Sequence, residues 1–330
     1  MKKVFCIGET LIDFIPAEKN LSLKEVTNFE RVAGGAPMNV AIAVAKYGGN
    51  SAMITKIAND HFGDHIFSVL QENGVDTSYC LRSDEGETGL AFVSNDEHGE
   101  RSFNFYRKNA ADLLLSPEEI EVEWFREGDI LHFCSVDLID SPMKHAHQKA
   151  IKDFRDLGGI VSFDPNVRLP LWPNEESCRL TINEFLPSAD IVKISDEELT
   201  FITGIENEKD AIAALFVGKV QVVVYTKGSK GAEIYLKSGE NFQDKGFKVT
   251  VADTTGAGDA FIGGFLSELV ALNPTVQNLS KKISENHERI LTFANASGAL
   301  TASVKGAIHA APAKRHVLNF IAVQRGISIN

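Results

Sequence analysis

Short and largely apolar runs recur along most of the chain, and they constrain its fold more than any other feature of the sequence. They cover 4–7, 51–57, 130–133, 160–163, 191–194 and 220–225. Because these runs are continuous rather than alternating, they indicate strands that are buried on both faces of a sheet. Helices are predicted between them, over 38–47, 61–73, 141–157, 196–203 and 209–217. The alternation predicts an α/β fold whose mainly parallel sheet is flanked by helices and binds ligands at its carboxyl edge.

Two segments, 11–32 and 90–107, break this alternation. Both have the period-two pattern of exposed strands, and the second is interrupted by a turn over 95–100. We expect them to form a small antiparallel β lid, built from about 11–33 and 89–108, on a single domain that spans 1–330. The last third of the chain is predicted to be helical over 259–272 and 285–303, with a closing element near 312–323.

The charge and the cysteine content exclude several classes of protein. The 330 residues include 33 Lys and Arg against 45 Asp and Glu, a net charge of −12, and no basic run occurs. A nucleic-acid or membrane partner is therefore not expected, since binding to phosphates needs clustered basic residues. The four cysteines are far apart, no signal peptide precedes them, and no apolar stretch approaches the roughly 18 residues of a membrane helix. A cytoplasmic protein with reduced thiols is predicted.

A glycine-rich turn between a strand and an apolar helix is the strongest motif in the chain. It reads Asp-Thr-Thr-Gly-Ala-Gly-Asp-Ala-Phe over 253–261. Backbone N–H groups at such a helix start form an anion hole, here from Gly256, Ala257 and Gly258. Asp259 lies in the first helical turn, where a carboxylate beside a transferring phosphoryl group can accept a proton from a hydroxyl. The pattern alone equally allows Asp259 to be a helix-capping residue.

A second motif, Gly-Gly-Ala-Pro-Met-Asn over 34–39, opens a helix that is apolar nearly all round. The two glycines, Gly34 and Gly35, allow a ligand to approach the backbone. Asn39 is the polar residue of this helix, and its amide is suited to bind sugar hydroxyls. The alternative is that Asn39 satisfies local backbone groups.

Together, these two motifs resemble the two signature patterns of the ribokinase-like (phosphofructokinase B-type) carbohydrate kinases. The resemblance covers nearly the whole chain, from Gly8 to Ala307. It implies a Rossmann-like α/β domain with a small β lid, and the ATP-dependent phosphorylation of a sugar hydroxyl. It also implies that Asp259 is the base and that residues 256–258 form the anion hole.

Within this family, Gly-Gly-Ala-Pro over 34–37 and Asp-Pro-Asn-Val-Arg-Leu-Pro-Leu-Trp over 164–172 are most similar to fructokinases. Fructose phosphorylated at its 6-hydroxyl is the substrate implied. The residues that the resemblance assigns to the sugar are Asp13, Gly34, Gly35, Asn39, Phe103, Phe105, Arg107, Arg168 and Asp259. Without the family context, a surface salt bridge is the favoured interpretation of Arg168, and the same holds for Arg107.

The resemblance also implies a nucleotide site and two kinds of cation. It assigns ATP to Asn166, Lys193, Thr226, Lys227, Gly228, Gly231, Gly256, Gly258 and Asn295. Mg²⁺ would accompany ATP and contact Glu198 through water, although Ser195 stands where many relatives carry Asn. A monovalent cation, K⁺, is implied near Asp253, Thr255, Ser303 and Gly306.

Several alternatives stay open at this point. A 2-keto-3-deoxygluconate kinase would use Arg107 and Arg168 to clamp a carboxylate, and a sugar-binding regulatory protein would need no turnover. A homodimer through the lid edge is possible. His61 and His65 lack a third metal ligand, so a solvated helix face is expected there. The acidic stretch from Asp112 to Glu123 is expected to cover a surface helix.

Overall fold

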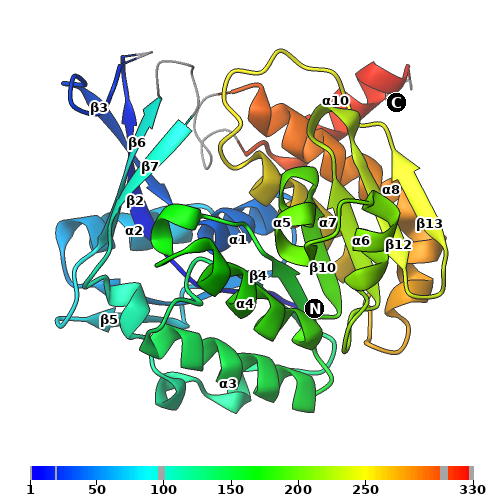
Figure 1. The fold of residues 1–330 in the computed structure, drawn as a ribbon, viewed down its shortest axis with the longest axis horizontal. Helices are drawn as coiled ribbons and strands as arrows, with labels where there is room; N and C mark the ends of the chain where they lie inside the picture. The colour runs from blue at the N-terminus through cyan, green and yellow to red at the C-terminus, as the bar shows by residue number, and fades with distance from the viewer. Residues whose placement is uncertain (1, 19–20, 96–100, 305–310, 327–330) are drawn as a thin grey trace.

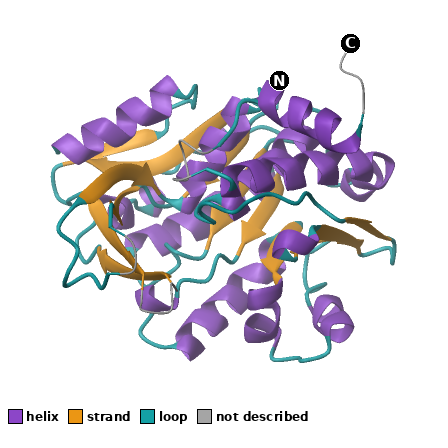
Figure 2. Ribbon diagram, turned by 90° about the horizontal axis from the view of Figure 1, so that it is seen from above, coloured by secondary structure: helices purple, strands orange, loops and turns teal. Residues whose placement is uncertain are grey.

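The structure is a computed structural model that describes residues 2–18, 21–95, 101–304 and 311–326. Over this part of the chain, a nine-stranded sheet runs through the molecule in the order β13-β12-β11-β10-β9-β8-β1-β4-β5, with helices on both of its faces (Figure 1, Figure 2). Neighbouring strands from β11 to β5 are parallel, whereas β12 and β13 extend one edge as antiparallel strands. The predicted α/β fold with a mainly parallel sheet is therefore confirmed.

The six strands expected from the sequence are all present in this sheet. They are β1 (Val4–Ile7), β4 (Ser51–Ala58), β8 (Ile130–Cys134), β9 (Ile160–Asp164), β10 (Ile191–Ser195) and β11 (Val222–Thr226). Alternate residues of β1 enter two different cores: Val4 and Cys6 pack on one face of the sheet, and Phe5 and Ile7 on the other. The strands that the sequence analysis missed lie at the two edges: β5 (Cys80–Ser83), β12 (Ala232–Leu236) and β13 (Asn241–Asp244).

Helices cover both faces of the sheet. One face packs against α1 (Ala36–Lys46), α2 (His61–Glu72), α7 (Ala257–Val270) and α8 (Leu279–Ala302), and α10 (Lys314–Arg325) packs outside α8. The other face packs against α3 (Pro142–Asp156), α4 (Glu175–Phe185), α5 (Asp196–Thr203) and α6 (Glu208–Ala214). The sequence analysis missed α4, although Asn174 caps its first turn by accepting from the Ser177 amide.

A smaller sheet of four strands projects from one side of the molecule (Figure 1). Its order is β3-β2-β6-β7, formed by β2 (Leu11–Pro16), β3 (Phe29–Gly34), β6 (Gly89–Asn95) and β7 (Arg101–Tyr106). Each of the two expected hairpins is antiparallel, but β2 and β6 pair in parallel. The expected small antiparallel sheet is therefore confirmed, with one parallel pair at its centre, where the first strands of the two hairpins lie side by side and run the same way.

The acidic stretch differs from its prediction as a surface helix. It forms three 3₁₀ turns, over Ala111–Leu114, Pro117–Glu119 and Val122–Trp124. Pro117 cannot continue a helix that enters from its amino side, which accounts for the interruption. Asp112 is buried rather than exposed. In the described residues, we find no helix that is long and apolar enough to cross a membrane.

The order of the strands places a ligand site beside β1. The chain moves from β1 to β4 and β5 on one side, and later returns to β8 on the other side. At such a switch point, the loops that follow the strands separate and leave a crevice at the carboxyl edge of the sheet. The loops that follow β1, β8, β9 and β10, together with the start of α7, face this crevice.

Candidate active site

A cleft of about 430 Å³ occupies this crevice, below the small sheet. It brings together residues that lie up to 250 positions apart in the sequence, from Glu9 to Asp259. The residues expected from the sequence that line it are Asp13, Gly35, Asn39, Phe105, Asn166, Arg168, Lys193, Glu198, Thr255, Gly256, Gly258 and Asp259. The cleft has a sugar end, defined here by Asp13, Gly35, Asn39 and Phe105, and a phosphate end, defined by Lys193, Glu198, Gly256 and Gly258.

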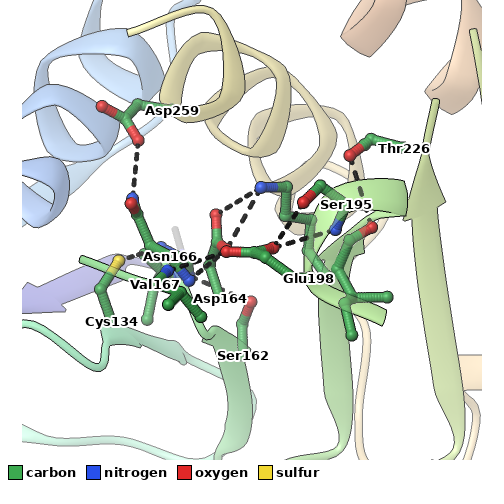
Figure 3. Close-up of polar contacts among 12 residues, drawn as sticks. Cys134, Ser162, Asp164, Asn166, Val167, Ser195, Glu198, Thr226 and Asp259 are labelled. Atoms are coloured by element: carbon green, nitrogen blue, oxygen red, sulfur yellow. Dashed lines mark hydrogen bonds and ion pairs between the residues drawn. The ribbon is translucent and has the colours of Figure 1, made fainter. Parts of the chain in front are cut away.

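Asp259 lies between the two ends, in the first turn of α7 (Figure 3). Its Oδ2 accepts a hydrogen bond from Nδ2 of Asn39 at 2.8 Å, and its Oδ1 accepts from Nδ2 of Asn166 at 3.4 Å. Burial raises the pKa of Asp259, while the Asn39 hydrogen bond and the charges of Arg168 and Lys193 lower it, and the net shift is upward. The carboxylate is therefore held in a fixed position and made more basic than an exposed aspartate.

The start of α7 forms the phosphate end of the cleft. Gly256 caps the helix with a left-handed φ of 74°, a conformation in which glycine carries no steric penalty. The amide of Ala257 donates to the Thr254 carbonyl at 3.1 Å, so this member of the expected anion hole is already bonded. A Cβ placed on Gly258 would lie 3.5 Å from Nζ of Lys193. The ammonium group of Lys193 thus lies over the helix start, and both features favour an anion there.

Lys193 of β10 belongs to a buried ionic group with Asp164 and Glu198, and Figure 3 labels these two carboxylates. Its Nζ lies 3.0 Å from Oδ2 of Asp164. Burial opposes the charge of Lys193, but the charges of Asp164 and Glu198 outweigh it and raise the pKa of Lys193. Burial raises the pKa of Asp164 to about 6 although Lys193 acts in the opposite direction. At neutral pH, Lys193 is therefore a cation that faces the cleft.

The sugar end combines polar groups with an apolar wall. A Cβ on Gly34 would lie 2.2 Å from Oδ2 of Asp13, so the glycine leaves space for this carboxylate. Gly35 has a φ of 114°, and a Cβ on it would lie 2.3 Å from the Glu9 carbonyl oxygen. Asn39 donates to Asp259, and its buried Oδ1 has no hydrogen-bond partner among the described residues. Phe105 of β7 contributes the apolar wall.

The two arginines assigned to the sugar occupy different surroundings. Arg168 lines the cleft, and its charge lowers the pKa of Asp259. Arg107 is 5% exposed and does not line the cleft. Its Nη2 lies 2.7 Å from Oδ2 of Asp112 and 2.7 Å from Oδ1 of Asp137. Of the two expectations for Arg107, the structure therefore shows the salt bridge. Phe103 lies on β7, and Gly34 ends β3 behind Asp13.

The remaining residues assigned to ATP lie beyond the phosphate end of the cleft. Thr226 pairs with Ser195 in the sheet, and Gly228 opens the turn that follows. Lys227 forms ion pairs with Glu208 and Glu233. A Cβ on Gly231 would lie 2.0 Å from the Asp244 carbonyl oxygen. Nδ2 of Asn295 donates to Oδ1 of Asp244 at 2.9 Å, which ties α8 to the end of β13.

The residues assigned to cations differ in how well they suit a metal ion. Glu198 accepts from the Val167 amide and from the amide and hydroxyl of Ser195, so each of its oxygens already accepts a hydrogen bond. Such a carboxylate suits contact through water better than direct ligation. Asp253 accepts from the Thr255 amide, and the Asp253 amide donates to the Ala302 carbonyl beside Ser303. Gly306 lies outside the described residues. Within those residues, no group of three His, Cys, Asp or Glu could hold a metal.

Several cleft residues were not assigned a role by sequence reasoning, among them Glu9, Val136 and Thr254. Glu9 follows β1, Val136 follows β8 and Thr254 precedes the glycine turn, and all three line the cleft. Asp164, the partner of Lys193, was also not assigned a role. Their common signal is position, because each lies just after a buried strand or just before a helix at the carboxyl edge of the sheet.

The fold and this cleft define an enzyme that transfers a phosphoryl group between small molecules, because a buried carboxylate, an anion hole and a lysine meet below a small sheet. Residues 1–314 match the family model described as pfkB family carbohydrate kinase. The chain belongs to this family.

Several fructokinases are among the proteins that this chain resembles. The chain is 40% identical over 319 residues to fructokinase-1 of Zea mays, covering 96% of this chain and 97% of that protein. It superposes on a fructokinase with bound ATP from Xylella fastidiosa with a TM-score of 0.88, 35% identity and coverage of 98% and 99%. For a fructokinase from Vibrio cholerae O395 bound to fructose, ADP and calcium, the TM-score is 0.85, the identity 34% and the coverage 97% and 99%.

Proposed function

We propose that this protein is an ATP-dependent fructokinase that phosphorylates the 6-hydroxyl of fructose. The observation that carries the proposal is the position of Asp259, which is buried between the sugar end and the phosphate end of the cleft and held by Asn39 and Asn166. A group in this position can reach both a sugar hydroxyl and the phosphate that it attacks. Its raised pKa favours proton acceptance.

In the proposed reaction, the Asp259 carboxylate takes the proton of the sugar hydroxyl. The hydroxyl oxygen then forms a bond to the γ-phosphorus of ATP, and the bond from that phosphorus to the β–γ bridging oxygen breaks, so that ADP leaves. The amides at the start of α7 and the ammonium group of Lys193 stabilise the negative charge of the transferring group. The small sheet, acting as a lid, would keep water from competing with the sugar.

The choice of fructose rests on the relatives and on the two arginines. Fructokinases match nearly the full length of the chain at 40% and 35% identity. A 2-keto-3-deoxygluconate kinase would use both Arg107 and Arg168 as a carboxylate clamp. Because Arg107 is paired with Asp112 and Asp137, only Arg168 of the two lines the cleft, and one arginine gives a weaker clamp.

The cations are also part of the proposal. Mg²⁺ would enter with ATP and offset the charge of its phosphates, and the satisfied carboxylate of Glu198 suits contact with the ion through water. The calcium in the Vibrio cholerae structure agrees with a divalent ion in the family. A K⁺ ion near Asp253, Thr255 and Ser303 would depend on carbonyl oxygens beside the glycine turn, where Asp253 and the end of α8 are joined by a backbone hydrogen bond.

Release of ADP from Mg-ATP tests this function. The sugars are fructose, glucose, mannose, ribose, 2-keto-3-deoxygluconate and adenosine, each with and without K⁺. Turnover with fructose far above the others is expected. A preference for the keto-deoxy acid would contradict the sugar and keep the kinase. Sugar binding with no turnover for any acceptor would favour a regulatory protein.

Two further proposals concern the protein as a whole. A homodimer through the lid is proposed because β3 and β7 are the edge strands of the small sheet and present unpaired backbone groups. Sedimentation that shows only a monomer would contradict it. A cytoplasmic location is proposed, because the four cysteines are free thiols, as is usual in a reducing compartment. Fractionation of cells that produce the protein tests the location.

A further inference from the structure

A buried ion cluster lies where the small sheet joins the large one, and the proposed reaction does not use it. It consists of Glu9, Arg107, Asp112 and Asp137, each at most 5% exposed. The guanidinium of Arg107 is at its centre, with Nη2 at 2.7 Å from Oδ2 of Asp112 and at 2.7 Å from Oδ1 of Asp137. We refer to these four residues as the root cluster.

The chain connects the small sheet to the rest of the molecule at four points: before β2, after β3, before β6 and after β7. Carboxylates of the root cluster hold the first two of these attachments. Thr10, directly before β2, donates its amide to Oδ2 of Asp112 at 3.3 Å. Ala36, two residues after the end of β3, donates its amide to Oε1 of Glu9 at 2.8 Å. The strand that leaves the large sheet and the strand that returns to it are therefore both tied to the root cluster.

The other two attachments meet at Arg107 itself. Arg107 directly follows Tyr106, the last residue of β7. Gly89 is the first residue of β6, and a Cβ placed on it would lie 3.1 Å from Cγ and 3.3 Å from Nε of Arg107. The missing side chain at Gly89 thus leaves space for the arginine. All four attachments of the small sheet converge on the root cluster.

The partners of Arg107 belong to the body of the molecule. Asp137 lies in the loop after β8, the neighbour of β1 in the large sheet, and is fully buried. Asp112 lies in the 3₁₀ turn Ala111–Leu114, which packs against β4 and α3. Arg107 consequently joins the end of β7 to two fixed points on the large sheet and its helices.

The charges of the root cluster suit a role in positioning more than a role in stability. Three carboxyl groups surround one guanidinium, and burial raises the pKa of all three: that of Glu9 well above its usual range, that of Asp112 to about 6, and that of Asp137. Several buried atoms have no hydrogen-bond partner among the described residues: Oε2 of Glu9, Nε and Nη1 of Arg107, and Oδ2 of Asp137. Such a group stabilises less than apolar packing would, but its bonds require one arrangement.

We propose that Arg107 is a positioning residue for sugar binding: through Asp112 and Asp137 it holds the small sheet at one angle on the large sheet, without touching the sugar. Phe105 lies two residues before Arg107, and Asp13 lies four residues after Glu9; both line the sugar end of the cleft. A change in the angle moves these groups relative to Asp259. The inference rests on the proposed function as a sugar kinase.

A double-mutant cycle separates positioning from contact. Arg107→Gln and Asp137→Asn each break the same ion pair, and each is expected to raise KM for fructose roughly tenfold, with KM for ATP changed less than about twofold. The double variant is expected to resemble either single variant. Arg107→Lys keeps the charge but cannot bridge two carboxylates with one planar group, so an intermediate KM is expected. The control is Arg82→Gln, whose ion pair with Asp64 is at the surface.

Two kinetic results would contradict a positioning role for Arg107. A large rise in KM for Arg107→Gln with an unchanged KM for Asp137→Asn would show that Arg107 contacts the sugar, and would overturn the proposal. Effects that add in the double variant would also overturn it.

Hydrogen exchange gives a second readout that needs no turnover and no knowledge of the sugar. The amides of β6 and β7 are expected to exchange faster in both single variants than in the wild type, while β10 and β11 are unchanged. Equal rates in β6 and β7 would overturn the proposal, and exchange that is faster throughout would show a general loss of stability instead. A wild type without turnover on fructose contradicts the proposed sugar, whereas the exchange rates still decide the role of Arg107.

Discussion

Two buried cations, Lys193 and Arg107, are held by aspartates near the ends of strands, but their surroundings differ in one respect. Lys193 is paired with Asp164 and lines the cleft, and a Cβ on Gly258 at the start of α7 would nearly touch its ammonium group. Arg107 is enclosed by Asp112, Asp137 and Glu9, and does not line the cleft. The first cation can pair with an arriving phosphate, and the second can only hold protein groups together. Access to the cleft, more than residue type or burial, therefore separates Lys193, which can bind a phosphate, from Arg107, which positions protein groups.

The carboxyl groups beside the two cations share a raised pKa. Burial raises the pKa of Asp164 and of Asp112 to about 6 in both cases, although each is next to a cation. Titration near the cleft should change catalysis, whereas titration in the root cluster should change the attachment of the lid. The following experiments test this division.

The largest effect is expected for Asp259→Asn. The amide cannot accept the proton of the sugar hydroxyl, so kcat is expected to fall by about a thousandfold, within the range for a lost general base. Steady-state kinetics with fructose and Mg-ATP give kcat, and calorimetry gives the affinity for fructose, which should be largely kept. Turnover close to that of the wild type would remove Asp259 from the mechanism.

The next largest effect is expected for Lys193→Met. Loss of a positioned cation at the phosphate end should lower kcat/KM for ATP by about a hundredfold, as for other groups that stabilise charge in the transition state. Binding of fructose should stay the same, in contrast to the variants of Arg107. Lys144→Met is the matched control, because Lys144 pairs with Glu184 on the far side of the large sheet. If Lys193→Met changed KM for fructose alone, the two cations would not differ as we describe.

Much of the large sheet could be predicted from the sequence, because a short, continuous apolar run is typical of a strand that is buried on both faces. The strands from β1 to β11 that the pattern indicated were all found, while β5, β12 and β13 were missed. These three lie toward the two ends of the sheet, β5 at one end and β12 with β13 at the other, and their residues mix polar with apolar types. The pattern of β13, exposed at every second residue, shows why no run was visible.

The residues of the candidate site could be predicted where a sequence motif fixes the backbone. They were harder to predict where the role of a residue depends on partners far away in the sequence. Asn39 and Asp259 lie 220 residues apart, and each was found through its own motif before the hydrogen bond between them was seen. Arg107 was assigned to the sugar through the family resemblance, and the sequence could not show that Asp112 and Asp137 would enclose it. Its partners come from a 3₁₀ turn and from a loop after β8, which have no periodic signal.

A smaller effect is expected on the pH dependence of kcat in Asn39→Ala. The hydrogen bond from Asn39 lowers the pKa of Asp259, so its loss should raise that pKa further. Because the base must be ionised, activity is lost as pH falls through its pKa, and the acid limb of kcat should move to higher pH. A shift of about half a unit to one unit is expected.

The measurement is kcat for fructose across acidic and neutral pH, with sugar at saturation, since KM should rise as well. An acid limb that stays where it is in the wild type would mean that another group controls it. A limb that moves to lower pH would contradict the direction of the Asn39 effect.

The smallest effect is expected on stability, in Asp112→Asn. The pKa of Asp112 is about 6 in the folded protein against an ordinary value of 3.8, because burial outweighs the attraction of Arg107. A carboxyl group whose pKa is higher in the folded state costs stability when it ionises. The free energy of unfolding therefore falls as pH rises from about 4 to about 6, and this contribution is constant outside that window.

The amide of the Asp112→Asn variant does not titrate, so the difference in Tm between variant and wild type should move in favour of the variant as pH rises through this window. Thermal unfolding at intervals between pH 4 and about 7 measures it. Asp64→Asn is the control, because this carboxylate is at the surface in its pair with Arg82. A constant difference for Asp112→Asn would mean that this carboxyl group is already ionised across the window. The root cluster would then stay charged across this pH range, as Lys193 does in the cleft. Lys193 and Arg107 would in that case differ only in their access to the cleft.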